Sequence, residues 1–284
     1  MPSEKRDRQH RNREEKRKRL QRAQRNALLK RRLIQSIWIA LIVMAVVTVS
    51  NLTKGSNTTT TTTTTTTQSS STTIAEPTTY TTPSGLGPAY EAFRGRQVAC
   101  GATAPPPARQ MQFDAPEDQQ IDPAATVTAT IATSCGDIVV QLDPAAAPQT
   151  VNSFVFLARQ GFFDGTVFHR IVPGFVIQGG DPTSAGTGGP GYTIADEFPP
   201  AGFTYDRDVV AMANSGPDST GSQFFIALGD TGLKPGFSVL GTVIDGDATL
   251  DAIAAVPVAP SASGENSDPQ ETVYINTVTI DITG

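Results

Sequence analysis

The sequence predicts a mainly β domain over residues 124–284, in the form of a closed antiparallel barrel with two helices. Two observations support this fold class. Many short apolar stretches are separated by Gly, Pro and Asp, and only two stretches have helical spacing. The last stretch, 273–282, alternates apolar and polar residues and must pair with an earlier strand. Closing the sheet into a barrel would provide that partner and remove the exposed edges that promote aggregation.

The predicted elements follow one another at short intervals. Strands are expected at 126–133, 138–142, 167–172, 175–178, 209–213, 223–228, 239–243 and 273–282. Pro148 is expected to open the first helix, because proline is favoured at the first helical position, and Gly161 to close it. The second helix is expected at 248–255, with Asp247 as its N-cap.

The charge of the chain is divided between two regions of opposite sign. Residues 1–32 contain 14 Lys and Arg against four acidic residues, whereas the remainder contains 8 against 23. The overall net charge of −5 therefore describes neither part. The basic tail has no aromatic residue for base stacking and too few apolar positions for an amphipathic face, so no binding of nucleic acid is expected.

An apolar segment at 33–52 follows the basic tail and reads LIQSIWIALIVMAVVTVSNL. About 20 such residues are enough for a helix to cross a bilayer, so a single transmembrane signal-anchor helix is predicted. A cleaved signal peptide is the alternative, but 32 residues precede the segment and no clear cleavage site follows it. The excess of Lys and Arg predicts a cytoplasmic N-terminus and places the rest of the chain on the outer side of the cell membrane.

Two segments separate the predicted span from the barrel. Residues 53–88 are rich in Thr and Ser, and a disordered linker is predicted there because almost nothing in it could be buried. Residues 89–123 are expected to form an irregular extension. The two cysteines, Cys100 and Cys135, are compatible with one disulfide in an oxidising compartment, and two free thiols are the alternative.

Several familiar kinds of site are not expected. Residues 186–191 match G-x-G-x-x-G, but no helix follows them, so dinucleotide binding is rejected. The chain has only two histidines, His10 and His169, which makes a metal site improbable. No G-x-S-x-G sequence is present to support a catalytic triad. No metal and no cofactor are therefore expected.

Two longer motifs are more informative. They are FHRIVPGFVIQGGD at 168–181 and MANSGPDSTGSQFFI at 212–226. In the first, two neighbouring strands would present Arg170, Phe175 and Gln178 among apolar side chains. Both motifs resemble the signatures of the cyclophilins, and the order and spacing of the elements are similar from about residue 126 to 282. The chain resembles a membrane-anchored bacterial, actinobacterial-like cyclophilin.

The resemblance implies a closed eight-stranded barrel with two capping helices, and peptidyl-prolyl cis/trans isomerase activity in a groove on its outer surface. Arg170 looks like the catalytic residue and Gln178 like the polar partner that positions it. The residues that look like substrate-binding residues are Phe175, Val176, Ala213, Asn214, Phe225, Leu233 and Phe237. The implied partners are proline-containing polypeptides, including exported or envelope proteins that need help to fold. A module that binds such segments without turnover is the alternative.

The residue types suit this reaction. Rotation about an X–Pro bond faces a barrier of about 20 kcal/mol, because amide resonance is lost. No bond breaks, so neither a nucleophile nor a metal is needed. A guanidinium directed at the proline nitrogen would bind the twisted amide better than the planar one, which is the requirement for catalysis.

The similarity is weaker between residues 229 and 241. Gly232 stands where many relatives have Trp, Phe237 where they have His, and Leu240 where Phe is common. In relatives the Trp covers part of a cyclosporin-type inhibitor and donates a hydrogen bond to it, so the resemblance implies weak cyclosporin binding here. These differences affect the far wall of the pocket rather than Arg170.

Overall fold

The structure is a computed structural model of the chain, and it describes residues 86–284. Its elements are α2 (Pro88–Arg94), the 3-10 helix η1 (Ala99–Gly101), β1 (Thr126–Thr133), β2 (Gly136–Leu142), α3 (Pro148–Arg159), β3 (Arg170–Val172), β4 (Val176–Gly179), β5 (Val209–Met212), β6 (Phe224–Ala227), β7 (Val239–Asp245), α4 (Asp247–Ala254), β8 (Val258–Pro260), β9 (Asn266–Pro269) and β10 (Ile275–Thr283). The predicted membrane span at 33–52 and almost all of the Thr-rich linker lie outside the described residues. Within 86–284, no helix is both long enough and apolar enough to cross a bilayer.

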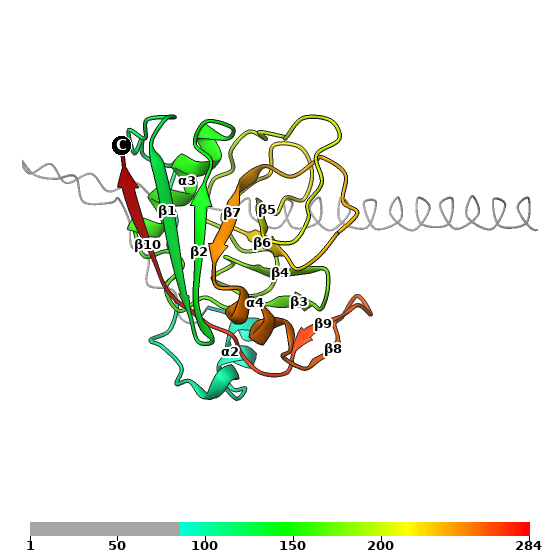
Figure 1. The fold of residues 1–284 in the computed structure, drawn as a ribbon. Helices are drawn as coiled ribbons and strands as arrows, with labels where there is room; N and C mark the ends of the chain where they lie inside the picture. The colour runs from blue at the N-terminus through cyan, green and yellow to red at the C-terminus, as the bar shows by residue number, and fades with distance from the viewer. Residues whose placement is uncertain (1–85) are drawn as a thin grey trace, which may run out of the picture. The chain divides into compact units, whose positions relative to one another are not determined.

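Eight strands form one antiparallel sheet in the order β10-β1-β2-β7-β5-β6-β4-β3, which curls around the core (Figure 1). The prediction of a closed barrel was wrong, because the edge strands β3 and β10 do not pair with each other. The expected strand at 167–172 forms only over its last three residues. Ahead of it, the Phe168 N–H donates to the Val273 carbonyl and the Ile275 N–H donates to the Thr166 carbonyl. The sheet is therefore a half-barrel, and these two hydrogen bonds connect the segment that precedes its edge strand β3 with residues at or just before the start of the other edge strand, β10.

Alternation along the strands separates two apolar clusters. Residues 177, 210, 212, 224 and 226 of β4, β5 and β6 face the main core, which also receives the buried faces of α3 and α4. The residues next to them in the strands, Val176, Ala211 and Phe225, face the opposite side of the sheet and join a second cluster. Because successive side chains in a strand point to opposite faces, the same short strands build both the core and an outer apolar surface.

The N-termini of the two capping helices, α3 and α4, are stabilised in different ways. Pro148 occupies the first turn of α3, as predicted, and Glu197 accepts hydrogen bonds from Gln149 N–H (3.1 Å) and Thr150 N–H (2.8 Å) at its N-terminus. The predicted N-cap of α4 was wrong, since Asp247 is the first helical residue and Gly246 precedes it at φ 111°. A side chain at Gly246 would lie 2.6 Å from the Asp137 carbonyl oxygen, so glycine is required there.

The extension is more ordered than expected, because it contains α2. Tyr90 and Phe93 of this helix are buried in a small cluster with Val167 and Tyr274. The Tyr90 hydroxyl donates to the Gly165 carbonyl (2.8 Å) and accepts a hydrogen bond from the Ala108 N–H (2.7 Å). The extension therefore packs against the domain through this small hydrophobic cluster.

A disulfide joins Cys100, in η1, to Cys135, in the turn between β1 and β2. No free cysteine occurs among residues 86–284. The bond closes a loop with a sequence separation of 35 residues and so connects the extension to the first hairpin of the sheet.

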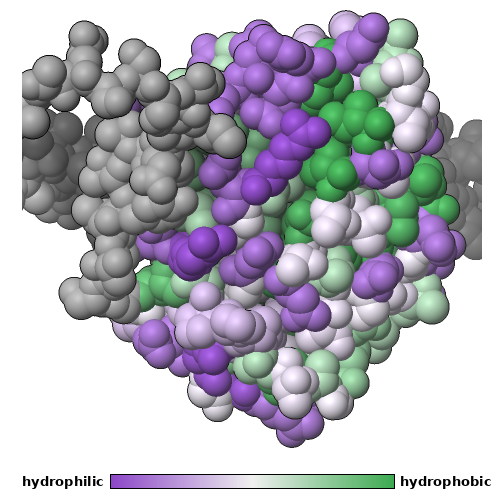
Figure 2. All heavy atoms as spheres, turned by 90° about the vertical axis from the view of Figure 1, so that its left-hand side faces the viewer, coloured by the Kyte–Doolittle hydropathy of each residue, from purple (hydrophilic) through white to green (hydrophobic). Residues whose placement is uncertain are grey.

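The edge strand β10 carries the alternation predicted for 273–282. Val278 is buried, whereas Thr277, Thr279 and Asp281 are exposed. The side of the domain that includes this strand has hydrophilic residues interspersed with smaller apolar patches (Figure 2). Exposed polar and charged side chains on an edge strand discourage pairing with a second molecule.

His169 is partly buried just before β3, and its Nδ1 is covered by protein without a hydrogen-bond partner in the described part of the chain. Burial lowers the pKa of His169 to about 4, against the opposing effect of the Asp181 carboxylate and with a smaller lowering effect from Arg170. The imidazole is therefore neutral at pH 7.

Replacing both Cys100 and Cys135 by Ser should lower the free energy of unfolding by about 3–4 kcal/mol, because the open chain regains loop entropy. Urea denaturation of the oxidised protein and of the variant measures this difference. As the control, a reductant should destabilise the wild-type protein and leave the variant unchanged. A loss below about 1 kcal/mol would contradict the expected contribution.

Acidification should destabilise the protein partly through His169. A lowered pKa in the folded state means that stability is fully present above pH 6.5 and is lost as the pH falls towards about 4. His169→Gln, which cannot take up this proton, should therefore lose about 2.5 kcal/mol less stability than the wild type between pH 7 and pH 4.5. Urea denaturation of both proteins at the two pH values measures the difference. Equal losses would show that His169 is not the group that titrates.

Candidate active site

Four residues form a row across the outer face of the sheet. Arg170 in β3 lies opposite Gln178 in β4, Gln178 lies opposite Phe225 in β6, and Phe225 lies opposite Ala211 in β5. Residues that lie directly opposite each other in neighbouring strands project to the same face. The two sequence motifs, 168–181 and 212–226, are therefore joined by strand pairing between β4 and β6.

The apolar end of this row is a hydrophobic cluster built from strands and loops. Val176, Ala211 and Phe225 come from the sheet, and Tyr205, Leu233 and Phe237 come from the loops. Phe225 and Phe237 meet edge to face with ring centroids 5.4 Å apart. The Tyr205 hydroxyl donates to the Phe237 carbonyl (2.7 Å) and accepts from the Phe237 N–H (3.0 Å), which fixes the loop.

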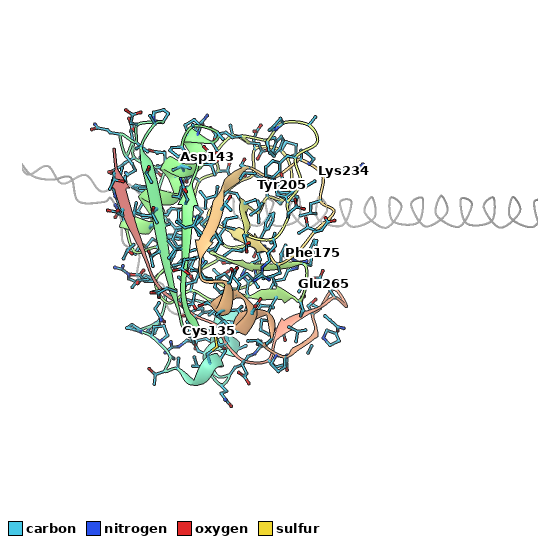
Figure 3. The ribbon with its side chains drawn as sticks, viewed as in Figure 1. Cys135, Asp143, Phe175, Tyr205, Lys234 and Glu265 are labelled. Carbon is cyan, nitrogen blue, oxygen red and sulfur yellow. A yellow bond between two sulfur atoms is a disulfide. The ribbon has the colours of Figure 1, made fainter. Side chains whose placement is uncertain are left out.

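This hydrophobic cluster is partly exposed to solvent. Phe175, Leu233 and Phe237 are only partly buried, and Phe175 and Tyr205 lie on the side of the domain away from β1 and β10 (Figure 3). The structure therefore brings together the expected proline-pocket residues. Leu240 does not belong to them, because it is buried in the main core.

The polar end of the row is a chain of hydrogen bonds. Arg170 Nη1 donates to Gln178 Oε1 over a long 3.5 Å, and Gln178 Nε2 donates to Gln223 Oε1 (3.1 Å). Gln223 Nε2 in turn donates to the Gly188 carbonyl (3.0 Å). The Arg170 Cζ lies 5.8 Å from the centre of the Phe175 ring, so the guanidinium lies beside the apolar pocket.

Glu265 is a neighbour of Arg170 that sequence reasoning did not identify. Its Oε2 accepts from Arg170 Nε (2.7 Å) and its Oε1 accepts from Arg170 Nη2 (2.8 Å), so the ion pair is bidentate. The hydrogen bonds from Arg170 hold the pKa of Glu265 below its usual value, against a smaller raising effect of burial. Glu265 lies in a Ser- and Gly-rich segment 95 residues from Arg170, and no local pattern marks it.

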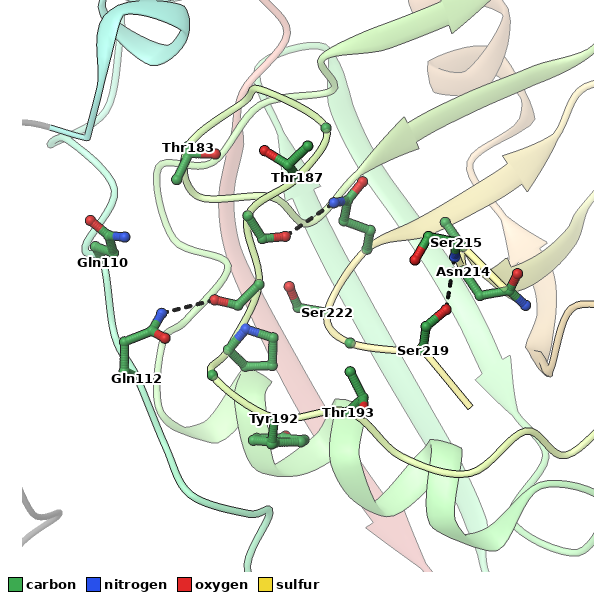
Figure 4. Close-up of a pocket in the computed structure, with 18 of the residues that line it drawn as sticks. Gln110, Gln112, Thr183, Thr187, Tyr192, Thr193, Asn214, Ser215, Ser219 and Ser222 are labelled. Carbon is green, nitrogen blue, oxygen red and sulfur yellow. Dashed lines mark hydrogen bonds between the residues drawn. The ribbon is translucent and has the colours of Figure 1, made fainter. Parts of the chain in front are cut away.

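A cavity of about 740 Å³, lined mostly by residues with polar side chains and by glycines, adjoins the row. Ala213, Asn214 and Gln178 line one side of it, so the remaining predicted substrate-binding residues lie here. Gln110 and Gln112 of the extension lie across the cavity from Asn214 and Ser215 (Figure 4). The Asn214 side chain donates to the Gly236 carbonyl (2.8 Å) and thereby links the cavity to the loop that carries Phe237.

The glycines at 186–191 have a structural role. The Gly188 N–H donates to Asp181 Oδ2 (3.0 Å), and a side chain at this position would collide with the buried Asp181 carboxylate. Gly191 has φ 96° and lies against the backbone of Phe113. The apparent dinucleotide motif is thus a loop packed against one aspartate and the extension. No group of three or more potential metal-ligating side chains occurs within the residues that the structure describes.

Gly232 is exposed, has φ 60° and has open space where a side chain would begin. No side chain at this position covers the pocket, which agrees with the reasoning behind weak cyclosporin binding. That binding stays a prediction.

Comparisons with known proteins agree with this geometry. Residues 128–280 match the family described as cyclophilin type peptidyl-prolyl cis-trans isomerase/CLD. The chain is 43% identical over 175 residues to peptidyl-prolyl cis-trans isomerase A of Mycobacterium tuberculosis, covering 56% of this chain and 94% of that protein. It is 42% identical over 177 residues to peptidyl-prolyl cis-trans isomerase B of Streptomyces anulatus, covering 56% and 98%.

A solved structure has the same fold. It is the cyclophilin-type peptidyl-prolyl cis-trans isomerase of Cryptosporidium parvum, determined in the presence of the dipeptide Ala-Pro. The two share 32% identity with a TM-score of 0.50, over 54% of this chain and 98% of that one. Together, the curled sheet, the family match and the similarity to these relatives show that the chain belongs to the cyclophilin-type peptidyl-prolyl cis-trans isomerases and is an isomerase of this type.

Proposed function

We propose that this isomerase rotates X–Pro bonds in the outer groove, with Arg170 stabilising the twisted prolyl amide. The observation that carries the proposal is the row Arg170–Gln178–Phe225, which places one guanidinium beside a partly exposed hydrophobic cluster. A proline ring suits a pocket lined by aromatic and aliphatic side chains, and its amide nitrogen would then face the polar end of the row. The related structure was determined in the presence of an Ala-Pro dipeptide, which supports a substrate of this class.

The chemistry follows from charge and position. In the twisted amide, the proline nitrogen becomes pyramidal and its lone pair is no longer delocalised. A guanidinium remains charged at all relevant pH values and offers N–H donors in a fixed plane. An interaction that is stronger with the twisted amide than with the planar amide lowers the barrier, whereas equal binding would only lower KM. The Gln178 side chain would keep Nη1 of Arg170 directed into the groove.

We further infer that the enzyme acts on exported or envelope polypeptides from the outer side of the cell membrane. The basic tail followed by the apolar segment at 33–52 supports an anchor with the domain outside. The Cys100–Cys135 disulfide supports an oxidising compartment. Uncatalysed X–Pro isomerisation takes roughly tens of seconds, so exported chains would fold faster with such an enzyme nearby.

Arg170→Ala should lower kcat/KM at least a hundredfold, since the guanidinium is expected to act on the twisted state alone. This corresponds to about 2.7 kcal/mol of transition-state stabilisation. A protease-coupled assay with an Ala-Pro peptide, or NMR exchange spectroscopy, measures the effect. Arg207→Ala is the matched control, because Arg207 pairs with Asp251 and does not belong to the row. If Arg170→Ala retained more than a third of the wild-type activity, the proposed role would be wrong.

The anchor can be tested on intact cells. The full-length chain should fractionate with membranes, and protease added outside should release a soluble domain by cutting between residues 53 and 88. Extended Thr-rich sequence exposes its backbone to proteases before a packed sheet does. Recovery of the chain in the cytosol, or a mature N-terminus just after Ser50, would contradict a signal anchor.

A further inference from the structure

Glu265 holds one edge of the Arg170 guanidinium. A guanidinium has five N–H donors, and the bidentate contact uses the Nε and Nη2 edge, leaving Nη1 towards Gln178 and the groove. Such a fork-to-carboxylate contact fixes the plane of the guanidinium as well as its distance. Without it, a long side chain that is 27% exposed would sample several rotamers over the open groove.

The position of Glu265 is itself fixed by the β8–β9 hairpin. The Ser261 N–H donates to the Glu265 carbonyl (2.7 Å), and the Gly264 N–H donates to the Ser261 carbonyl (2.8 Å), which closes the hairpin turn. Strand β9 packs against β3, which carries Arg170. The Glu265 carboxylate therefore extends to Arg170 from a turn whose backbone is fixed by hydrogen bonds and by the packing of β9 on β3.

The extension supports the same hairpin from the other side. Arg96 pairs with Asp268 of β9 (2.8 Å) and also donates to the Pro269 carbonyl. Its guanidinium lies 4.3 Å from the centre of the Phe93 ring, on the buried side of α2. The hairpin is therefore held between the extension and β3, and Glu265 lies at its turn.

We propose that Glu265 is a positioning residue for isomerisation, which holds the Arg170 guanidinium so that Nη1 and the free N–H of Nη2 face the prolyl amide. This inference rests on the catalytic role proposed for Arg170. The exposed ion pair contributes little to stability, because water screens it, so its value lies in geometry. Errors of about 1 Å in the placement of a catalytic group are enough to reduce rates up to about a hundredfold.

The test compares Glu265→Gln with the wild type in the full-length chain. The amide keeps the shape of the side chain but loses its charge and accepts with only one oxygen. We expect kcat/KM for an Ala-Pro peptide to fall roughly fivefold to thirtyfold through kcat, with KM little changed. Glu265→Asp, which keeps the charge on a shorter side chain, should recover part of the loss. Glu271→Gln, just after β9, is the matched control and should behave as the wild type.

A second readout follows Arg170 directly. In NMR spectra the Nε proton of Arg170 should exchange slowly with solvent in the wild type, because a carboxylate covers it. It should exchange faster in Glu265→Gln and remain slow in Glu271→Gln. A stability change alone would not move this signal.

The outcomes separate the two proposals when Arg170→Ala is measured in parallel. If Arg170→Ala is inactive and Glu265→Gln is as active as the wild type or more active, the positioning role is overturned and the carboxylate merely screens Arg170. If Arg170→Ala is itself active, the proposed role of Arg170 fails and the inference about Glu265 fails with it. A selective fall in kcat together with faster exchange of the Nε proton supports the proposal.

Discussion

The two-residue alternation in β4, β5 and β6 is the constraint on which the rest of the structure depends. These strands are short and apolar on both faces, so one set of side chains fills the core and the other forms an outer apolar surface. A slip of one residue in the pairing of β4 with β6 would exchange the two sets. It would also separate Gln178 from Phe225, which now lie opposite each other. Core packing and groove geometry are therefore fixed by the same register.

Loops complete the apolar surface on the outer face of the sheet. The loop that carries Leu233 and Phe237 is held by Tyr205, whose hydroxyl bonds both backbone groups of Phe237, and by the side chain of Asn214. The rings of Tyr205 and Phe225 then each contact the Phe237 ring edge to face. Polar contacts in this loop thus preserve an apolar surface that stays partly exposed for a ligand.

Much of the fold could be predicted from local patterns, because the strands of this domain have clear alternation or clear boundaries. The limits of β1 agree with the alternation of 126–133, and Pro148 marks the start of α3. The predicted closure failed because pairing between β3 and β10 depends on how far the sheet curls, which no local pattern encodes. The hairpin β8–β9 was missed, since its Ser-, Pro- and Gly-rich sequence resembles a loop.

The same distinction applies to the site. Arg170, Phe175, Gln178 and Phe225 lie within two continuous motifs, so a single sequence shows them. Glu265 lies outside both motifs and contacts Arg170 from 95 residues away in the chain. Nothing next to Glu265 in the sequence suggests a carboxylate aimed at an arginine. Long-range partners of this kind become visible only when the topology is known.

The extension connects these features, because it contacts both ends of the groove. Gln112 bonds the Gly189 carbonyl at the polar cavity, while Arg96 pairs with Asp268 below the turn that carries Glu265. The disulfide from Cys100 to the first hairpin limits how far this segment can move away from the sheet. A segment that lies outside the family match at 128–280 thus supports residues on both sides of the row. The extension therefore contacts segments next to the row, even though none of its residues belongs to the row that contains Arg170.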